Sequence, residues 1–301
     1  MPGIKEIKNR IEGVEDTYKL TNAMYLISST KLRKAREVAA LSRPFFDKLK
    51  NEIKTVLEVS GVKDSRYYSA DPAVHDEGPA GILVITSDKG LCGAYNRDII
   101  KKAVALAERK KDPVIFACGD YGKRYFQRNG FNVFEEFDHV CKEPTHEEAR
   151  LMSEEMLTEY DNGKIKSLYA VYSDLTAGRS YEPVTTRLLP FGYVEGMHAK
   201  EKGEEDETPQ MEFYPGPKEV LDSLIRTYMA GYVYSVLTSG YCSEQSARMN
   251  SMSSSNKNAE ELLEELCTEY HKARQAEITQ EITEVCAGAN AQKKKESGRH
   301  D

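Results

Sequence analysis

The sequence predicts an α/β protein in which two long terminal helices enclose an inserted domain of alternating strands and helices. Three observations carry this prediction. Apolar residues recur every three or four positions in both end regions, short apolar runs of strand length occupy the middle, and helix-length segments separate those runs. Because strands that alternate with helices favour parallel pairing, the inserted domain is expected to contain a mainly parallel sheet.

Residues 1–60 predict a long helix with an apolar seam. The seam alternates spacings of three and four, which is the heptad pattern of a coiled coil. Its members are Ile4, Ile7, Ile11, Val14, Tyr18, Thr21, Tyr25, Ser28, Leu32, Ala35 and Ala39. After Val14 the seam residues become smaller and more polar, which does not suit a stable homodimeric zipper. Pro44 falls inside the pattern and removes a backbone hydrogen bond, so a kink or break is expected near Arg43.

Glycines and prolines in residues 61–80 predict a linker, and the α/β domain is expected over residues 81–195. The predicted strands are residues 81–86, 113–118 and 167–172, with a last strand near residues 185–189. The predicted helices lie near residues 94–110, 120–129 and 145–160. The third helix begins with Thr145 and Glu148 at the spacing of a capping box.

An acidic, proline-containing loop is predicted over residues 196–217, followed by a second long helix over residues 218–291 and a disordered tail over residues 292–301. The apolar seam of this helix resumes out of phase at Ile278, Ile282 and Val285. The change of phase indicates that the last turns meet a different environment.

The charge is unevenly placed. The formal net charge of -7 argues against nucleic acid as a partner. No acid occurs between Asp16 and Glu37, whereas five bases do, and these form what we term the basic collar: Lys19, Lys31, Arg33, Lys34 and Arg36. The collar fits either a solvated helix face or docking onto an acidic partner ring.

Several classes of protein are disfavoured by composition. No apolar run reaches the length that crosses a bilayer, and the first residues resemble neither a secretory signal nor a transit peptide. The 6 cysteines are scattered singly, which predicts reduced thiols rather than a disulfide framework or a zinc site. The 6 histidines form no metal-binding motif, so no metal and no cofactor are expected.

The segment Thr86 to Gly93 joins a predicted strand to a predicted helix, which is a layout that can place phosphates at a helix N-terminus. Neither G-x-G-x-x-G nor G-x-x-x-x-G-K-[ST] is present. Cys92 could be a nucleophile near that helix start, but no histidine follows within local reach. A tight turn packed on the sheet is the favoured interpretation, and a nucleotide-dependent enzyme using the central α/β domain stays as the alternative.

The C-terminal residues Ile278-Thr279-Gln280-Glu281-Ile282-Thr283-Glu284-Val285-Cys286-Ala287-Gly288-Ala289-Asn290-Ala291 resemble the signature of the γ subunit of F-type ATP synthases. Other segments resemble the same family in the same order: residues 4–11, 21–24, 31–35, 87–96, 188–190 and 243–249. The chain lacks a closely spaced cysteine pair such as chloroplast members carry, so it resembles the bacterial type. A generic coiled-coil adaptor fits these ordered motifs less well.

The resemblance implies that the terminal helices form an antiparallel coiled coil and that the inserted domain is Rossmann-like. It also implies a central-stalk rotor, without catalytic residues, that couples transmembrane proton or sodium flow to ATP synthesis or hydrolysis by rotating inside a hexamer of α and β subunits. The implied partners are the α, β and ε subunits and the membrane c-ring. The implied location is the cytoplasmic face of the cell membrane, where the complex would hold the chain peripherally.

By the same resemblance, eight residues would contact the hexamer or couple to it: Met24, Lys31, Arg33, Arg248, Arg274, Gln275, Thr279 and Glu281. Residues 250–258 depart from the family pattern. They are rich in serine and asparagine where the family is richer in alanine, which puts hydroxyl and amide groups at positions where close helix packing is expected.

Overall fold

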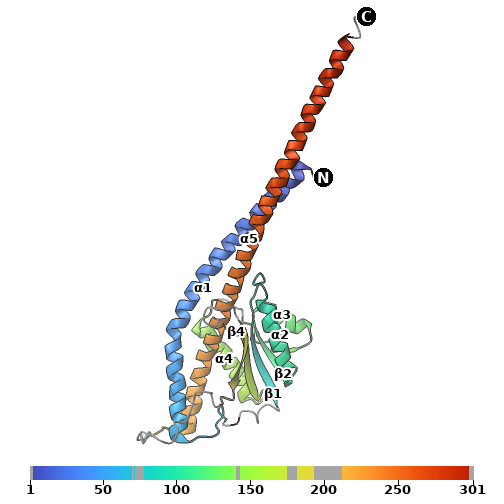
Figure 1. The fold of residues 1–301 in the computed structure, drawn as a ribbon. Coiled ribbons are helices and arrows are strands. Elements are labelled where there is room, and N and C mark those ends of the chain that lie inside the picture. The colour runs from blue at the N-terminus through green and yellow to red at the C-terminus, as the bar shows by residue number, and fades with distance from the viewer. Residues whose placement is uncertain are drawn as a thin grey trace. The chain divides into compact units, whose positions relative to one another are not determined.

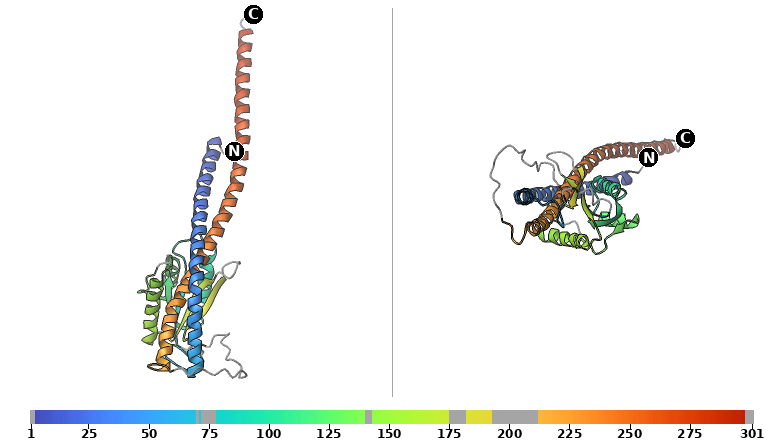
Figure 2. Two further views of the ribbon diagram at one scale, coloured as in Figure 1. Left: turned by 90° about the vertical axis from the view of Figure 1, so that its left-hand side faces the viewer. Right: turned by 90° about the horizontal axis from the view of Figure 1, so that it is seen from below.

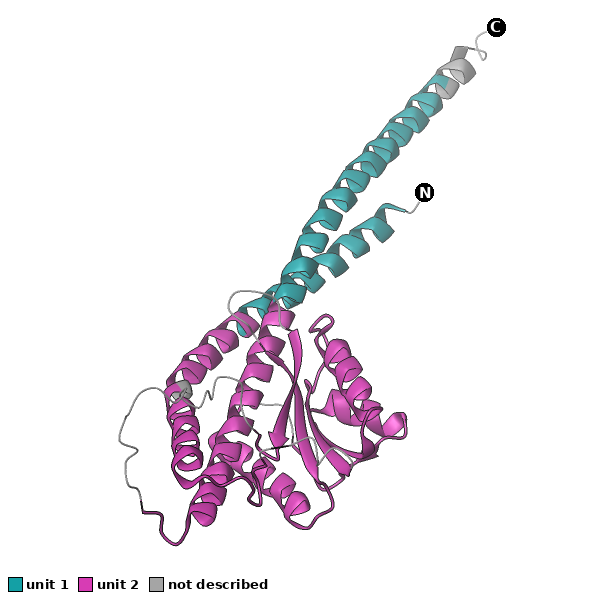
Figure 3. Cartoon of the chain, turned by 60° about the horizontal axis from the view of Figure 1, so that its bottom comes forward, with its two compact units in different colours: residues 1–27, 250–301 teal, residues 28–249 magenta. Residues whose placement is uncertain are grey.

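The computed structural model describes residues 3–69, 71, 78–139, 143–174, 182–192 and 212–297. The chain divides into two compact units (Figure 3). Unit 1 comprises residues 1–27 and 250–301, and unit 2 comprises residues 28–249. Two long helices contribute to both units: α1 (Ile4–Ser60) and α5 (Pro217–Ser297).

Unit 2 contains a five-stranded sheet. Its strands are β1 (Pro79–Ile85), β2 (Lys111–Cys118), β3 (Asn132–Val133), β4 (Ser167–Asp174) and β5 (Glu182–Leu189). They lie in the order β3-β2-β1-β4-β5, and only the β4–β5 pair is antiparallel. The prediction of a mainly parallel sheet is therefore confirmed. The two-residue strand β3 was not predicted.

Helices cover both faces of this sheet (Figures 1 and 2). Leu83 and Ile85 of β1 pack with residues of α4 (His146–Asp161), α5 and the end of α1. Ile82 and Val84 point to the opposite face and pack with α2 (Tyr95–Ala107) and α3 (Asp120–Arg128). Burial on both faces explains why the β1 sequence is continuously apolar rather than alternating.

The predicted helix start at Thr145 is confirmed. The Thr145 hydroxyl accepts a hydrogen bond of 3.2 Å from the Glu148 backbone N–H, and α4 begins at the next residue, His146. This bond satisfies one of the N–H groups that lack a partner in the first turn of a helix.

Of the predicted kink or break near Arg43, the break is wrong, because α1 stays helical through Pro44. Packing accounts for this continuity, since the turns after Pro44 are held by the core of unit 2. The Phe46 ring lies against the backbone of Gly231 in α5, and Ile53 and Val56 are buried. Such contacts outweigh the single backbone hydrogen bond that a proline removes.

Part of the predicted linker is packed rather than open. Tyr67 and Tyr68 are only 2% and 6% exposed. The Tyr67 carbonyl accepts a hydrogen bond of 2.6 Å from Phe191 N–H, and Ser69 N–H donates to the Phe191 carbonyl at 3.1 Å. Residues 67–69 therefore pair with the backbone of Phe191, just beyond the end of β5.

Helices α1 and α5 pair in antiparallel fashion. In unit 1, the Tyr18 hydroxyl donates to Glu260 at 2.9 Å, and the Thr21 hydroxyl donates to Asn256 at 2.5 Å. In unit 2, Leu32 and Ala35 form an apolar cluster with Tyr241 and Cys242. Every predicted seam residue of α1 is buried or half-buried, which confirms the heptad assignment.

Helix α5 ends later than predicted. It is helical through Ser297, so the tail predicted from residue 292 does not begin there. Lysine, glutamate and glutamine dominate the added turns, and these residues have high helix propensity. Residues 298–301 and residues 193–211, which include most of the predicted acidic loop, lie outside the described part of the chain.

Candidate functional site

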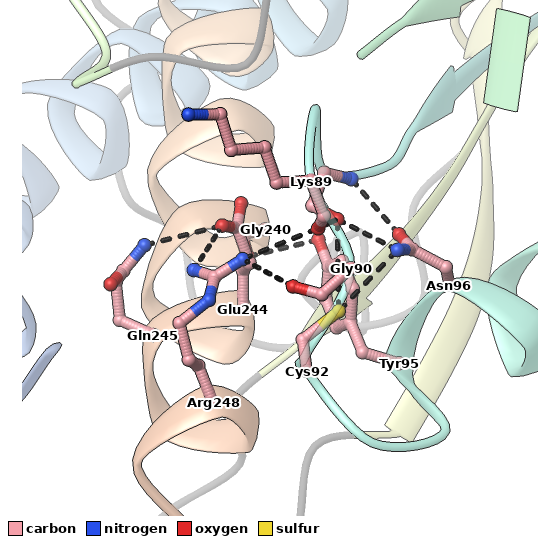
Figure 4. Close-up of polar contacts among 10 residues, drawn as sticks. Lys89, Gly90, Cys92, Tyr95, Asn96, Gly240, Glu244, Gln245 and Arg248 are labelled. Atoms are coloured by element: carbon pink, nitrogen blue, oxygen red, sulfur yellow. Dashed lines mark hydrogen bonds and ion pairs between the residues drawn. The ribbon is translucent and has the colours of Figure 1, made fainter. Parts of the chain in front are cut away.

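The turn that links β1 to α2 is held closed by its own side chains (Figure 4). Ser87 N–H donates to the Asn96 side-chain oxygen at 3.0 Å, and Asn96 Nδ2 donates back to Ser87 Oγ at 2.7 Å. The Ser87 hydroxyl donates to the Lys89 carbonyl at 2.6 Å. These bonds occupy the polar groups of the turn, in agreement with the predicted tight turn packed on the sheet.

Cys92 belongs to the same network as a buried thiol. Its side chain is 2% exposed, and Asn96 Nδ2 donates to Sγ at 3.4 Å. Burial raises the pKa of the Cys92 thiol, with opposing contributions from the Ser87 hydrogen bond and the nearby Arg248 charge. A raised pKa keeps the sulfur protonated near neutral pH, and the protonated form is a poor nucleophile.

Arg248 fastens this turn to α5. Its guanidinium forms an ion pair of 2.5 Å with Glu244, and their side chains are only 11% and 6% exposed. The other guanidinium nitrogen donates to the Lys89 and Gly90 carbonyls at 3.4 and 3.3 Å. Tyr95 adds a second link, because its hydroxyl donates to the Gly240 carbonyl at 3.0 Å. Arg248 therefore joins α5 to the β1–α2 turn as one body.

The ion pair between Glu244 and Arg248 could have been predicted from the sequence, although the resemblance did not point to it. Glu244 and Arg248 are four residues apart on a predicted helix, with the acid first, which is the favoured arrangement for a helical ion pair. Their carbonyl partners on the distant turn could not be found from spacing. The structure thus assigns Arg248 contacts inside unit 2 in addition to the hexamer contact that the resemblance implied.

The other predicted site residues fall into two groups. Lys31 and Arg33 are exposed on α1 in unit 2 and make no ion pair within the described residues. In unit 1, Met24 is half-buried on α1, whereas the remaining predicted residues are exposed on α5: Arg274, Gln275, Thr279 and Glu281.

Two other members of the basic collar already have acidic neighbours. Lys34 forms an ion pair of 2.6 Å with Glu143 in unit 2, and Lys19 forms one of 3.0 Å with Asp16 in unit 1. Lys31, Arg33 and Arg36 make no ion pair within the described residues, so they are the collar positions whose charge is most available to a partner.

The last turns of α5 expose an apolar stripe. Ile278, Ile282 and Val285 are 42%, 59% and 72% exposed. Tyr18 lies opposite Glu260 in the antiparallel pair, so Ile4, at the start of α1, lies opposite the turn around Arg274. Helix α1 therefore does not cover α5 beyond that turn. The change of environment predicted at Ile278 is therefore explained: from this turn onward α5 no longer packs against α1.

Residues 250–258 pack despite their polar composition. Met252 is buried, as is Ala259 just after the segment. Asn256 meets α1 by accepting from Thr21 at 2.5 Å and donating to Asn22 at 3.5 Å. Hydrogen bonds across the pair thus replace part of the close packing that alanine would give.

Among the described residues, no three histidine, cysteine or acidic side chains gather as a metal site. No helix in the described part of the chain combines the length and apolar character that a membrane span needs.

Comparisons with known proteins place these features in a family. A profile of the family described as ATP synthase matches residues 3–292. The ATP synthase gamma chain of Acetivibrio thermocellus is 36% identical over 299 residues, covering 97% of this chain and 100% of that protein. The ATP synthase gamma chain of Caldanaerobacter subterraneus is 35% identical, covering 96% of this chain and 99% of that protein.

Solved structures show the same fold. A chain of the Euglena gracilis mitochondrial ATP synthase superposes with a TM-score of 0.62 at 15% identity, covering 96% of this chain and 94% of that chain. A chain from the central stalk and c-ring of the Tetrahymena thermophila mitochondrial ATP synthase gives a TM-score of 0.56 at 19% identity, covering 78% of this chain and 98% of that chain. With its seam, signature and full-length relatives, this chain belongs to the ATP synthase family as a gamma chain.

Proposed function

We propose that this chain is the central-stalk rotor of an ATP synthase, turning inside a hexamer of α and β subunits and coupling proton or sodium flow to ATP synthesis or hydrolysis. The observation that carries the proposal is the form of α5. It is one uninterrupted helix over Pro217–Ser297, paired antiparallel with α1, and its last turns expose Ile278, Ile282 and Val285. An exposed apolar stripe on a helix without a partner needs a surrounding surface to cover it.

The chain's part in this mechanism is mechanical rather than catalytic. A rotor drives its neighbours only if its contacts differ between their conformational states. The unequal lengths of α1 and α5 make the helix pair asymmetric, because α1 reaches only the turn of α5 around Arg274 whereas α5 continues beyond it. In the proposed mechanism ATP binds on the hexamer. The coupling contacts are the eight residues that the resemblance implied: Met24, Lys31, Arg33, Arg248, Arg274, Gln275, Thr279 and Glu281.

The proposed partners are the α, β and ε subunits and the c-ring. Support comes from the Euglena and Tetrahymena structures, whose assemblies include F1 or central-stalk components with a c-ring. The proposed location is the cytoplasmic face of the bacterial cell membrane, with the chain held there through the complex. The bacterial gamma chains among its relatives support that location.

Reconstitution tests the proposal. The purified chain should hydrolyse ATP no faster than buffer, and adding it to α and β subunits from the same source should assemble a complex and raise ATPase activity by about tenfold or more, a change of about 1.4 kcal/mol in the activation barrier. Steady-state ATPase assays with size-exclusion chromatography measure both. ATP hydrolysis by the chain alone, or failure to join the hexamer, would contradict the proposed function.

A second prediction concerns the exposed part of the collar. Lys31→Gln with Arg33→Gln should lower ATP-driven ion pumping in the reconstituted complex by roughly two- to fivefold, because each exposed charge contact contributes up to about 1 kcal/mol. The structure of α1 should be unaffected, since both side chains point to solvent. Pumping is measured by fluorescence quenching of an ion-gradient dye in vesicles.

The matched control removes two exposed positive charges elsewhere in unit 2, by Lys48→Gln with Lys63→Gln. This control should leave pumping within the scatter of the wild type. Equal losses in both double variants would show that net charge, not the collar, is responsible.

A further inference from the structure

A groove between α2 and β5 gathers positive charge on an acidic protein. The groove is lined by Lys101 and Lys102 of α2 and by Arg109 just after the helix end, together with a single acid, Asp98. Its floor is apolar and comes from Ala105 and Leu106 on one side and Pro183 on the other. The chain as a whole carries a net charge of -7, so this local excess runs against the overall balance.

In the part of the chain that the structure describes, the three cations of the groove have no acidic partner. All three side chains are exposed. Within the described residues, Lys101, Lys102 and Arg109 make no side-chain ion pair or hydrogen bond. Asp98 lies near another cation, Arg97, at 3.4 Å. Cations on the neighbouring α3 behave differently: Lys123 pairs with Asp138 at 2.8 Å and Arg124 with Asp120 at 3.0 Å.

Positive charge continues past the end of α2. Lys110 and Arg187 both donate to the Tyr169 hydroxyl, at 2.7 and 2.6 Å, and both cations also lie over the Tyr169 ring. Arg187 follows Pro183 and Thr185 at alternate positions of β5, so all three are on the face of the strand that α2 covers. Repulsion among Lys101, Lys102 and Arg109, which no acid relieves within the described residues, favours binding of an anionic partner.

We propose that this groove binds an acidic segment of a partner subunit. Carboxylates of the segment meet Lys101, Lys102 and Arg109, and an apolar side chain between them covers Leu106 and Pro183. Lys101 and Lys102 lie on α2 and Arg109 lies just beyond its end at Ala107, so the three cations follow one another along the groove. That arrangement suits several carboxylates in series, whereas a single phosphate is bound by groups that converge on one point, such as the N–H groups of a helix start.

The existence of the groove does not depend on the rotor assignment, but the search for its partner among ATP synthase subunits rests on the proposed function. The first test uses the purified full chain and a fluorescein-labelled peptide, Glu-Gly-Glu-Leu-Glu-Gly-Glu. Fluorescence anisotropy should show binding that weakens by about tenfold or more in the Lys101→Gln, Lys102→Gln, Arg109→Gln variant, as expected for loss of three charge contacts.

The control variant, Lys123→Gln, Arg124→Gln, Arg128→Gln, removes the same charge from α3 and should bind the peptide within about twofold of the wild type, because two of its cations are already paired. Equal weakening in both variants would overturn the proposal. So would stronger binding of inorganic phosphate, ATP or phosphatidylglycerol vesicles than of the peptide, since each would identify a different ligand class.

The second test uses the assembled complex. A photo-crosslinking amino acid replaces Ala105, which is exposed in the middle of the groove, and a control position is Tyr121 on α3, which is 45% exposed. The Ala105 position should crosslink to a subunit segment rich in Asp and Glu. An assembled complex that gives no crosslink from Ala105, or gives one to a basic or apolar segment, overturns the groove proposal; failure to assemble counts instead against the rotor assignment.

Discussion

Replacing Glu244 by alanine should lower the free energy of unfolding by about 3–5 kcal/mol, the usual cost of leaving one member of a buried ion pair without its partner. Arg248 would remain in a site where its side chain is 11% exposed, held against the Lys89 and Gly90 carbonyls but without the carboxylate that balances its charge. The measurement is urea unfolding of the full chain followed by circular dichroism.

Two controls make this result specific. Glu277→Ala removes a pair of similar length, 2.6 Å to Arg274, whose side chains are 50% and 45% exposed, and should cost less than about 1 kcal/mol. The double variant Glu244→Ala, Arg248→Met should be more stable than Glu244→Ala, because the unbalanced charge is gone. If the single and double variants were equally unstable, the ion pair would not be the cause.

Gly119→Ala should be comparably destabilising, by about 2–6 kcal/mol, because two costs of about 1–3 kcal/mol each add at this position. Gly119 is the N-cap residue of α3 and has a φ of 95°, a backbone conformation that residues with a side chain rarely adopt. A Cβ there would lie 2.3 Å from the Thr86 carbonyl oxygen, which belongs to the backbone at the end of β1. Soluble expression and the urea midpoint measure the effect.

Gly130→Ala separates the two costs. Gly130 also has a positive φ, 74°, but no atom lies within 4 Å of the place where its Cβ would be. Its replacement should therefore show only the backbone cost, about 1 kcal/mol. Equal losses at Gly119 and Gly130 would mean that the contact with Thr86 does not matter.

Local pattern was enough to predict most of the fold. Heptad spacing identified the buried face of α1, because a helix pair buries residues at regular intervals regardless of which helix supplies the partner surface. The continuous apolar runs identified β1 and β4, since strands covered on both faces need no polar side chains. Thr145 marked the start of α4 through its own side chain.

Features that depend on distant contacts were missed or misjudged. Pro44 predicts a break from local sterics, and only the contact of Phe46 with Gly231 shows why α1 continues. Tyr67 and Tyr68 lie in a segment with linker composition, yet the end of the sheet buries them. Tertiary packing overrides local preference in both cases.

The candidate site divides in the same way. Exposure of Ile278, Ile282 and Val285 follows from a phase change that is visible in the sequence. The contact of Arg248 with the β1–α2 turn joins residues far apart in the chain, so no spacing rule could reveal it. The groove of Lys101, Lys102 and Arg109 likewise needed β5 to be placed beside α2.

Rotation tests the central proposal most directly. A bead would be attached through an introduced cysteine at Gln127 on α3, with Cys141, Cys267 and Cys286 replaced by serine, and the α and β hexamer would be fixed to a surface. The account predicts that ATP turns the bead in one direction and that the turning stops when ATP is removed. A bead that stays still, or only diffuses, while the same complexes hydrolyse ATP would contradict it.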